Sequence, residues 1–314
     1  MRNINNILIL LMLATLAGCK GINSDPYTDT PTTGRIAIGV DESFRPVIEA
    51  ELMVFHEFYR YAEITPNYLP EQRALTLLIE DSTRLIIISR PLVSEEKNFF
   101  EQKNLFPREI KIATDAVAVI IHPDNPDSLL SLNDFKRIIT GEICQWNQLD
   151  PINQTGSIDV IFDNQQSSTV HFIHDSICSG KSFSKHLYAL EQNLDVVDYV
   201  AEHRNAMGLI GVSWISDVDD STQSSFLKKI KVVALSREEN AVWENSYQPY
   251  QAYLNDGSYP LTRDIYVITV EPRNGLATGF MSFLACDKGQ RIILKAGILP
   301  AQAPVRLVKV TDHL

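Results

Sequence analysis

Short apolar runs alternate along the chain with segments in which apolar residues recur every three or four positions. Runs of about four to eight apolar residues predict buried strands, and the longer period predicts helices that pack one face against a sheet. The predicted strands are 35–40, 64–69, 84–88, 110–122, 158–162, 208–215, 230–236, 264–270 and 305–310, and the predicted helices are 46–61, 71–79, 131–139, 170–177, 182–188, 194–204 and 275–295. This alternation predicts an α/β fold.

Two of the predicted strands, 110–122 and 264–270, belong to long extended segments. The first is longer than a single strand needs, since strands are usually about five or six residues long. A segment of that length can leave one lobe and enter another, and 264–270 can return the chain to the first lobe. The pattern therefore predicts two lobes joined by two crossings.

Three of the predicted strands end in polar loops that carry hydroxyl residues. These residues are Ser43, Ser89, Ser167, Ser168 and Thr169. Hydroxyls beside the free backbone N–H groups of a helix start form a seat for an anion. Ligands of open α/β sheets bind beyond the carboxyl ends of the strands, so the three loops predict one shared anion site. The alternative for any single loop is a helix cap that binds nothing.

The start of the chain has the pattern of a bacterial lipoprotein signal. Arg2 precedes an apolar run too short to span a bilayer comfortably, and the run ends in Leu-Ala-Gly before Cys19. We expect residues 1–18 to be a signal peptide, Cys19 to carry the lipid, and residues 19–34 to form a tether. The alternative is an ordinary secretory signal with an incidental cysteine.

The composition is that of a globular protein, with 314 residues, 45% of them hydrophobic, and a formal net charge of −11. The acidic balance argues against nucleic acid as a partner, because nucleic acid requires a basic face. A small anion stays compatible, since local dipoles decide its binding. The cysteines other than Cys19 are Cys144, Cys178 and Cys286, which permit one disulfide without indicating the pair.

Histidine patterns and motif searches give little support to a metal centre or an enzyme. His171 and His174 lie three apart on a predicted helix, but no carboxylate–histidine motif accompanies them, and we expect no metal. The sequence has no Gly-x-Ser-x-Gly, Walker A or Gly-x-Gly-x-x-Gly motif, so we expect neither catalysis nor a cofactor. A phosphatase is the alternative class, and turnover of a chromogenic phosphoester would reveal it.

Two charged residues stand at the ends of predicted strands. Arg90 follows Ser89 and offers a fork of N–H donors to an oxyanion, and Asp163 begins the central loop. If the loops converge, we expect Asp163 to hold Arg90 in place or to accept a proton from the ligand. The alternative is a structural salt bridge between the two residues, away from any ligand.

Three ordered motifs resemble the phosphate-binding substrate-binding proteins of phosphate ABC transporters. They are IATDAVAVIIHPDNP…LNDFKRIITGEICQWNQL over 112–149, YPLTR over 259–263 and GQRIILKAGILP over 289–300. The resemblance implies a type II periplasmic-binding-protein fold, in which two α/β lobes close on a dehydrated phosphate. It implies lobe 1 over 35–117 with 266–314, lobe 2 over 118–265, and crossings around 116–119 and 265–267.

By position, the resemblance also implies phosphate contacts in all three loops. The implied phosphate-binding residues are Ser43, the Phe44 backbone, Ser89, Arg90, Asp163, Ser167, Ser168 and Thr169. The family's second loop usually ends in Ser-Asp and its third begins with Arg, whereas this chain has Ser89-Arg90 and Asp163. The two charges are thus exchanged. A carboxylate that accepts a proton from the ligand is expected to exclude sulfate, which has no proton to give at neutral pH.

The resemblance implies a non-enzymatic lipoprotein that captures inorganic phosphate and presents it to an ABC permease. We expect a monomer anchored by its lipid to the bacterial cell envelope, facing the periplasm or the exterior, without a nucleic-acid partner. The alternatives are another tetrahedral oxyanion or an organic phosphate as the ligand, or a phosphate sensor that contacts a partner protein. Strong phosphate affinity with lobe closure favours transport, and a partner that binds only one form favours sensing.

Overall fold

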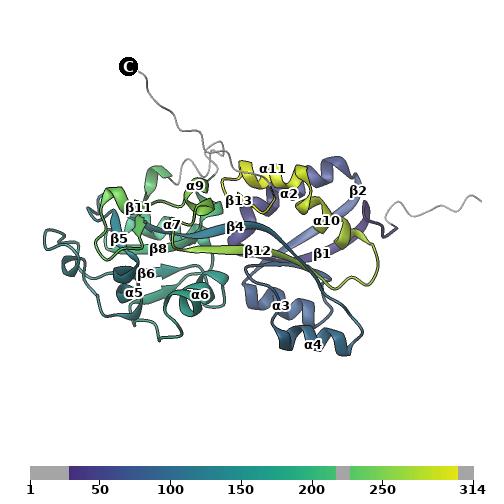
Figure 1. Ribbon diagram of the computed structural model, residues 1–314, viewed down its shortest axis with the longest axis horizontal. Coiled ribbons are helices and arrows are strands. Elements are labelled where there is room, and N and C mark those ends of the chain that lie inside the picture. Colours follow the sequence, from purple (N-terminus) through teal and green to yellow (C-terminus); the bar gives the residue numbers. More distant parts are fainter. Residues whose placement is uncertain (1–27, 217–226, 303–314) are drawn as a thin grey trace, which may run out of the picture.

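The computed structural model describes residues 28–216 and 227–302, and Figure 1 shows them as two halves joined by two long strands. The joining strands are β4 (Arg108–Ile121) and β12 (Thr262–Thr269). The first half contains the N-terminal strands and the C-terminal helices, and the second half contains most of the chain between β4 and β12. The predicted signal peptide, Cys19 and the predicted strand at 305–310 lie outside the described residues.

The first half is a sheet in which the strands follow the order β2-β1-β3-β12-β4. Its other strands and its helices are β1 (Thr33–Asp41), η1 (Glu42–Phe44), α2 (Arg45–Phe58), β2 (Tyr61–Leu69), α3 (Glu71–Ile79), β3 (Leu85–Ile88), α4 (Ser94–Gln102), α10 (Leu276–Ala285), α11 (Asp287–Lys295) and β13 (Leu299–Pro300). Strands β1, β2 and β3 are parallel, and β12 runs antiparallel to β3 and β4. All four side chains of β3 are buried, as a central strand covered on both faces requires.

The second half continues the sheet in the order β4-β8-β6-β7 and adds a three-stranded sheet, β11-β10-β5. Its elements are β5 (Leu129–Ser131), α5 (Leu132–Thr140), η2 (Trp146–Gln148), β6 (Asp159–Phe162), α6 (Ser168–Phe172), η3 (Ile173–Ile177), β7 (Leu187–Ala189), α7 (Asn193–Glu202), β8 (Ala206–Gly211), η4 (Val212–Trp214), β9 (Lys231–Val232), β10 (Ala234–Ser236), η5 (Trp243–Asn245), β11 (Ser246–Tyr247) and α9 (Gln251–Asn255). Helix α5 shows how the sequence sets its ends. Ser131 Oγ accepts the Asp134 N–H at 2.9 Å, and Gly141 ends the helix with a φ of 83°.

The two halves are connected through β4, because its two parts pair with different strands. Residues up to Ala116 pair with β12, and β4 pairs with β8 from Val117 onwards. Strand β12 begins opposite Ala116 and pairs with β3 from Tyr266. The expected second crossing, 265–267, lies within β12 at the point where its pairing with β3 begins. Tyr259 OH braces β4 by donating to the Val117 carbonyl at 2.7 Å.

Most predicted elements are present with shifted ends, but two predicted helices are wrong. Residues 182–188 form a loop that enters β7, because Leu187 and Tyr188 pair with β6. The predicted helix at 275–295 is two helices, since the extended backbone of Cys286 (φ −80°, ψ 169°) separates α10 from α11. The three cysteines Cys144, Cys178 and Cys286 are unpaired, so the disulfide that the sequence permits is absent among them.

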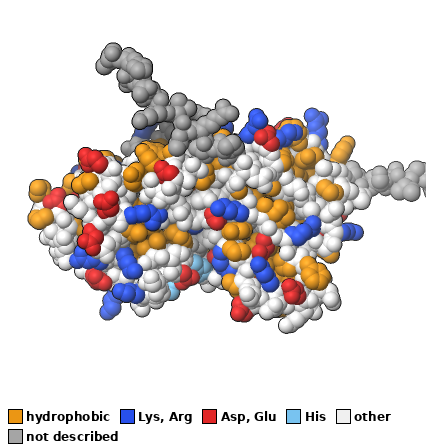
Figure 2. All heavy atoms as spheres, viewed as in Figure 1, with side chains coloured by type: hydrophobic (Ala, Val, Ile, Leu, Met, Phe, Trp, Pro, Cys, Tyr) orange, Lys and Arg blue, Asp and Glu red, His pale blue; other side chains and the backbone are white. Residues whose placement is uncertain are grey.

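Apolar side chains from both halves fill one large buried cluster, and a second cluster lies beneath α3 and α4. Within the described ranges, no helix has the length and apolar content needed to cross a membrane. Figure 2 shows acidic and basic side chains interspersed over one face of both halves, with histidine at the junction between them.

Candidate functional site

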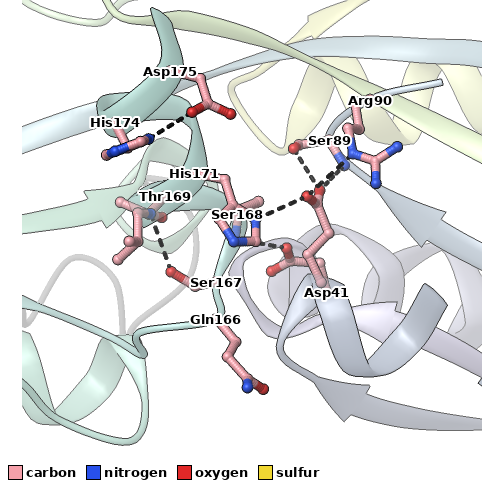
Figure 3. Close-up of polar contacts among 12 residues, drawn as sticks. Asp41, Ser89, Arg90, Gln166, Ser167, Ser168, Thr169, His171, His174 and Asp175 are labelled. Carbon is pink, nitrogen blue, oxygen red and sulfur yellow. Dashed lines mark hydrogen bonds and ion pairs between the residues drawn. The ribbon is translucent and has the colours of Figure 1, made fainter. Parts of the chain in front are cut away.

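The three hydroxyl-bearing loops lie where the two halves face each other, at the carboxyl ends of β1, β3 and β6 (Figure 3). The first loop is η1, the second is Ser89-Arg90, and the third runs from Asp163 to the start of α6. Ser43 Oγ of the first loop lies 3.4 Å from Asp163 Oδ2 of the third. The structure therefore brings together loops that are far apart in the sequence, as the anion-site prediction requires.

A buried carboxylate, that of Asp41, joins the first loop to the third. Asp41 Oδ1 accepts the Ser43 N–H at 2.9 Å, and Oδ2 accepts the Ser168 N–H at 3.3 Å. The residue is 0% exposed. Burial is the main cause that raises the pKa of Asp41 to about 6, and the Glu71 carboxylate raises it further, against the opposing charge of Arg263. Both oxygens of Asp41 thus bind backbone donors, one from each half.

Asp163 is buried beside Asp41 and bonds to hydroxyl and amide groups. Its Oδ1 accepts the Ser167 hydroxyl at 2.7 Å, and its Oδ2 accepts Asn193 Nδ2 at 3.3 Å. Burial raises the pKa of Asp163, and the hydrogen bond from Ser167 opposes that rise. The carboxyl group is therefore held as a hydrogen-bond acceptor at the floor of the cleft.

A buried cation of the site is Arg263 on β12. Its Nη1 donates to Ser168 Oγ at 2.8 Å and to Thr169 Oγ1 at 3.2 Å. Its Nε and Nη2 donate to Asp115 Oδ2 on β4, at 3.2 Å and 3.1 Å. The guanidinium also lies over the Phe44 ring, with Cζ 5.0 Å from the centroid. Arg263 therefore ties the crossing strands to the first and third loops.

The predicted site residue Arg90 does not pair with Asp163, which corrects the expected contact between them. Its guanidinium makes two hydrogen bonds of 2.9 Å with Glu96 of α4 and lies 3.9 Å from Glu71. Glu96 is six residues away in the sequence, so a bidentate local pair forms without any movement across the cleft. The fork of donors that we expected to face a ligand is occupied by this carboxylate.

Ser89 is also held by a carboxylate of the chain, as Figure 3 shows. Its N–H and hydroxyl both donate to Glu71 Oε2, at 2.8 Å and 2.6 Å. His171 Nδ1 of α6, which follows the third loop, lies 3.5 Å from Glu71 Oε1, across the cleft. Burial alone would raise the pKa of Glu71, but hydrogen bonds from His171 and Ser89 outweigh it and lower the pKa. The same hydrogen bond with Glu71 raises the pKa of His171.

The mouth of the cleft is acidic and hollow. Glu42 Oε2 accepts Asn193 Nδ2 at 2.5 Å, and burial raises the pKa of Glu42 to about 7. A cavity of about 320 Å³ opens here, lined in part by Asp41, Asp163 and Ser167. The cavity therefore adjoins the first and third loops.

The arrangement can bind an oxyanion that spans the cleft. Backbone N–H groups, a guanidinium and hydroxyls from both halves converge on buried carboxylate oxygens, and these are the donors that oxyanions require. The hydroxyl residues are Ser43, Ser167, Ser168 and Thr169, and all four are buried. Because the neighbouring carboxyl groups can accept a proton, the site also suits a ligand that carries one.

The sequence pattern indicates the three loops but not several of the residues that bond to them. The missed residues are Asp41, Glu71, Asp115, Asn193 and Arg263. Two signals were available, because Asp115 lies in the IATD segment and Arg263 ends the YPLTR segment. Asp41 and Glu71 carried no such signal, since an acidic residue after a strand or at a helix start is ordinarily a cap.

Comparison with known proteins yields one family and a set of relatives. The model of the PBP superfamily domain matches residues 25–288. The phosphate-binding protein PstS of Pseudomonas aeruginosa is 26% identical over 244 residues, which cover 73% of this chain and 71% of that protein.

Solved structures with a similar fold cover most of this chain. A Clostridium perfringens protein assigned as a phosphate ABC transporter substrate-binding protein, with phosphate bound, has a TM-score of 0.71 at 21% identity and covers 86% of this chain and 100% of its own. An ABC-type phosphate transport receptor from Vibrio cholerae has a TM-score of 0.63 at 16% identity and covers 85% of this chain and 100% of its own. These likenesses confirm the predicted two-lobed α/β fold.

Proposed function

The chain belongs to the PBP superfamily, and from this membership we propose that it captures inorganic phosphate between its lobes for delivery to an ABC permease. Phosphate binding is the function that names the PstS relatives. One observation of the site carries the proposal: donors from both halves already hold a buried oxyanion, the Asp41 carboxylate. Phosphate oxygens require the same donors.

The predicted site residues enter this proposal with one change of role. The phosphate donors are Ser43, the Phe44 backbone, Ser89, Ser167, Ser168 and Thr169. Arg263 supplies the buried positive charge, because Arg90 is paired with Glu96. Asp163 accepts the ligand's proton, and this acceptor selects phosphate over sulfate.

The wider assignment is also part of the proposal. Residues 35–117 with 266–314 form lobe 1, and residues 118–265 form lobe 2, so that closure completes the site. Residues 1–18 are removed as a signal peptide, Cys19 carries the lipid, and residues 19–34 tether a monomer to the cell envelope. The names of the relatives support a binding protein rather than an enzyme.

Isothermal titration of the purified protein with phosphate, and separately with sulfate, tests the proposal at pH 7. We expect saturable heat with phosphate and none with sulfate, because sulfate offers no proton to Asp163. Saturable heat with sulfate alone, or with an organic phosphate alone, would replace phosphate with that ligand. No heat with phosphate, sulfate or an organic phosphate would rule out the proposed capture function without bearing on the fold.

A further inference from the structure

We propose that the Asp41 carboxylate is an internal occupant of the oxyanion site, so that phosphate binds only by displacing it. The inference rests on the proposed function and adds the residue that sets the affinity. Asp41 lies in lobe 1, and its carboxylate accepts the same kind of backbone N–H donors that a bound anion would accept. Asp41 is therefore an affinity-determining residue rather than one more phosphate ligand.

The geometry of Asp41 is that of a captured ligand. One oxygen accepts the Ser43 N–H of its own half, and the other accepts the Ser168 N–H of the opposite half, 127 residues away. The residue has no exposure to solvent. A carboxylate that bridges two halves through backbone donors occupies the position at which a tetrahedral oxyanion would make the same contacts.

The charges around Asp41 require displacement rather than joint binding. The carboxylates of Asp163 and Glu71 also lie in the site, and Arg263 is the buried guanidinium that opposes them. A phosphate added beside an ionised Asp41 would place like charges together in a poorly solvated cleft, where Coulomb repulsion is strong. The N–H groups of Ser43 and Ser168 are also already bound to Asp41, so phosphate reaches them only by taking the place of this carboxylate.

The structure offers room for that exchange. The cavity of about 320 Å³ adjoins both Asp41 and Ser167. It can admit the anion and receive the displaced side chain. In the second loop as well, a carboxylate of the chain occupies donors that a phosphate would use, because Glu71 accepts the N–H and the hydroxyl of Ser89.

The substitution Asp41→Ser separates this role from the local fold. The Asp41 side chain caps η1 by accepting the Ser43 N–H, and serine is an equally good cap whose shorter side chain does not extend to Ser168. Asp41→Asn keeps the size and removes the charge. Asp198→Ser is the matched control, because it deletes one exposed carboxylate, paired with Lys229, on α7.

Phosphate titration of these variants and hydrogen exchange over residues 163–172 test the inference. We expect Asp41→Ser to bind phosphate at least about tenfold more tightly than the parent, a change of about 1.4 kcal/mol. We expect Asp41→Asn to fall between the two and Asp198→Ser to match the parent. Without phosphate, the Ser168 N–H should exchange faster in Asp41→Ser, and phosphate should restore its protection.

Two results would overturn the inference. One is equal phosphate affinity in the parent and Asp41→Ser, which would leave the capture function standing. The other is equal exchange at Ser168 in the two ligand-free proteins, which would show that Asp41 does not hold this donor. If no variant binds phosphate, the proposed function fails, and the exchange data alone decide whether Asp41 occupies the site.

Discussion

Arg263→Ala should lower the free energy of unfolding by about 3–5 kcal/mol, the range for breaking one side of a buried ion pair. The Arg263 side chain is 2% exposed and its partner Asp115 is 0% exposed. Removing the guanidinium leaves the Asp115 carboxylate buried and takes away the donor to Ser168 and Thr169. Urea denaturation measures the loss, and phosphate titration of the folded fraction should show no binding, because the buried positive charge is gone.

A second substitution identifies the cause of this loss. Asp115→Asn in the Arg263→Ala background removes the unpaired charge, so it should recover part of the stability but none of the phosphate binding. Arg263→Lys keeps the charge without the planar fork and should lose less than the alanine variant. If Arg263→Ala is as stable as the parent, the buried pair does not hold the crossing strands together.

Glu51→Leu should raise the free energy of unfolding by about 1–3 kcal/mol at pH 7, because it removes a buried polar group without partners. Glu51 lies in α2 and is 0% exposed. Neither of its carboxyl oxygens has a hydrogen-bond partner within the described part of the chain. Burial, followed by the charge of Cys286, raises the pKa of Glu51 from 4.5 to about 9.

The pH dependence of stability gives the sign of this effect. Between pH 4.5 and about 9, the folded protein keeps a proton on Glu51 that the unfolded chain releases. The parent therefore loses stability as the pH rises through this window, by up to about 1.4 kcal/mol per pH unit. Urea denaturation at pH 5, 7 and 9 should show a smaller loss in Glu51→Gln. Parallel curves for the two proteins would mean that Glu51 is already ionised at pH 5 in the folded protein.

The sequence pattern predicted the strands well because burial on both faces leaves a strong local signal. The run at 84–88 became β3, and the helix predicted over 71–79 is α3 with the same bounds. The failures occurred where the local signal was weak. The break at Cys286 has neither a glycine nor a proline at that position, so the sequence gives no sign that two helices meet there. Residues 182–188 lead into β7, whose structure depends on pairing with the distant strand β6.

The loops of the site could be predicted, whereas their hydrogen-bond partners could not. A serine after a buried strand is visible in the sequence, and the carboxyl ends of neighbouring strands lie at one edge of a sheet. The contact of Asp41 with Ser168 joins residues 127 positions apart and exists only because the two halves face each other. Arg90 shows how a local contact can take precedence over an expected distant one. Its guanidinium pairs with Glu96, six residues away, and not with Asp163 across the cleft.

A crystal structure of the protein grown in saturating phosphate would show whether phosphate displaces the Asp41 carboxylate. We expect a phosphate between the backbone N–H groups of Ser43 and Ser168, with the hydroxyls of Ser168 and Thr169 and the Arg263 guanidinium around it. The Asp41 carboxylate should have left both N–H groups. A structure in which Asp41 still accepts both N–H groups, and the cleft holds no phosphate, would show that phosphate does not displace Asp41.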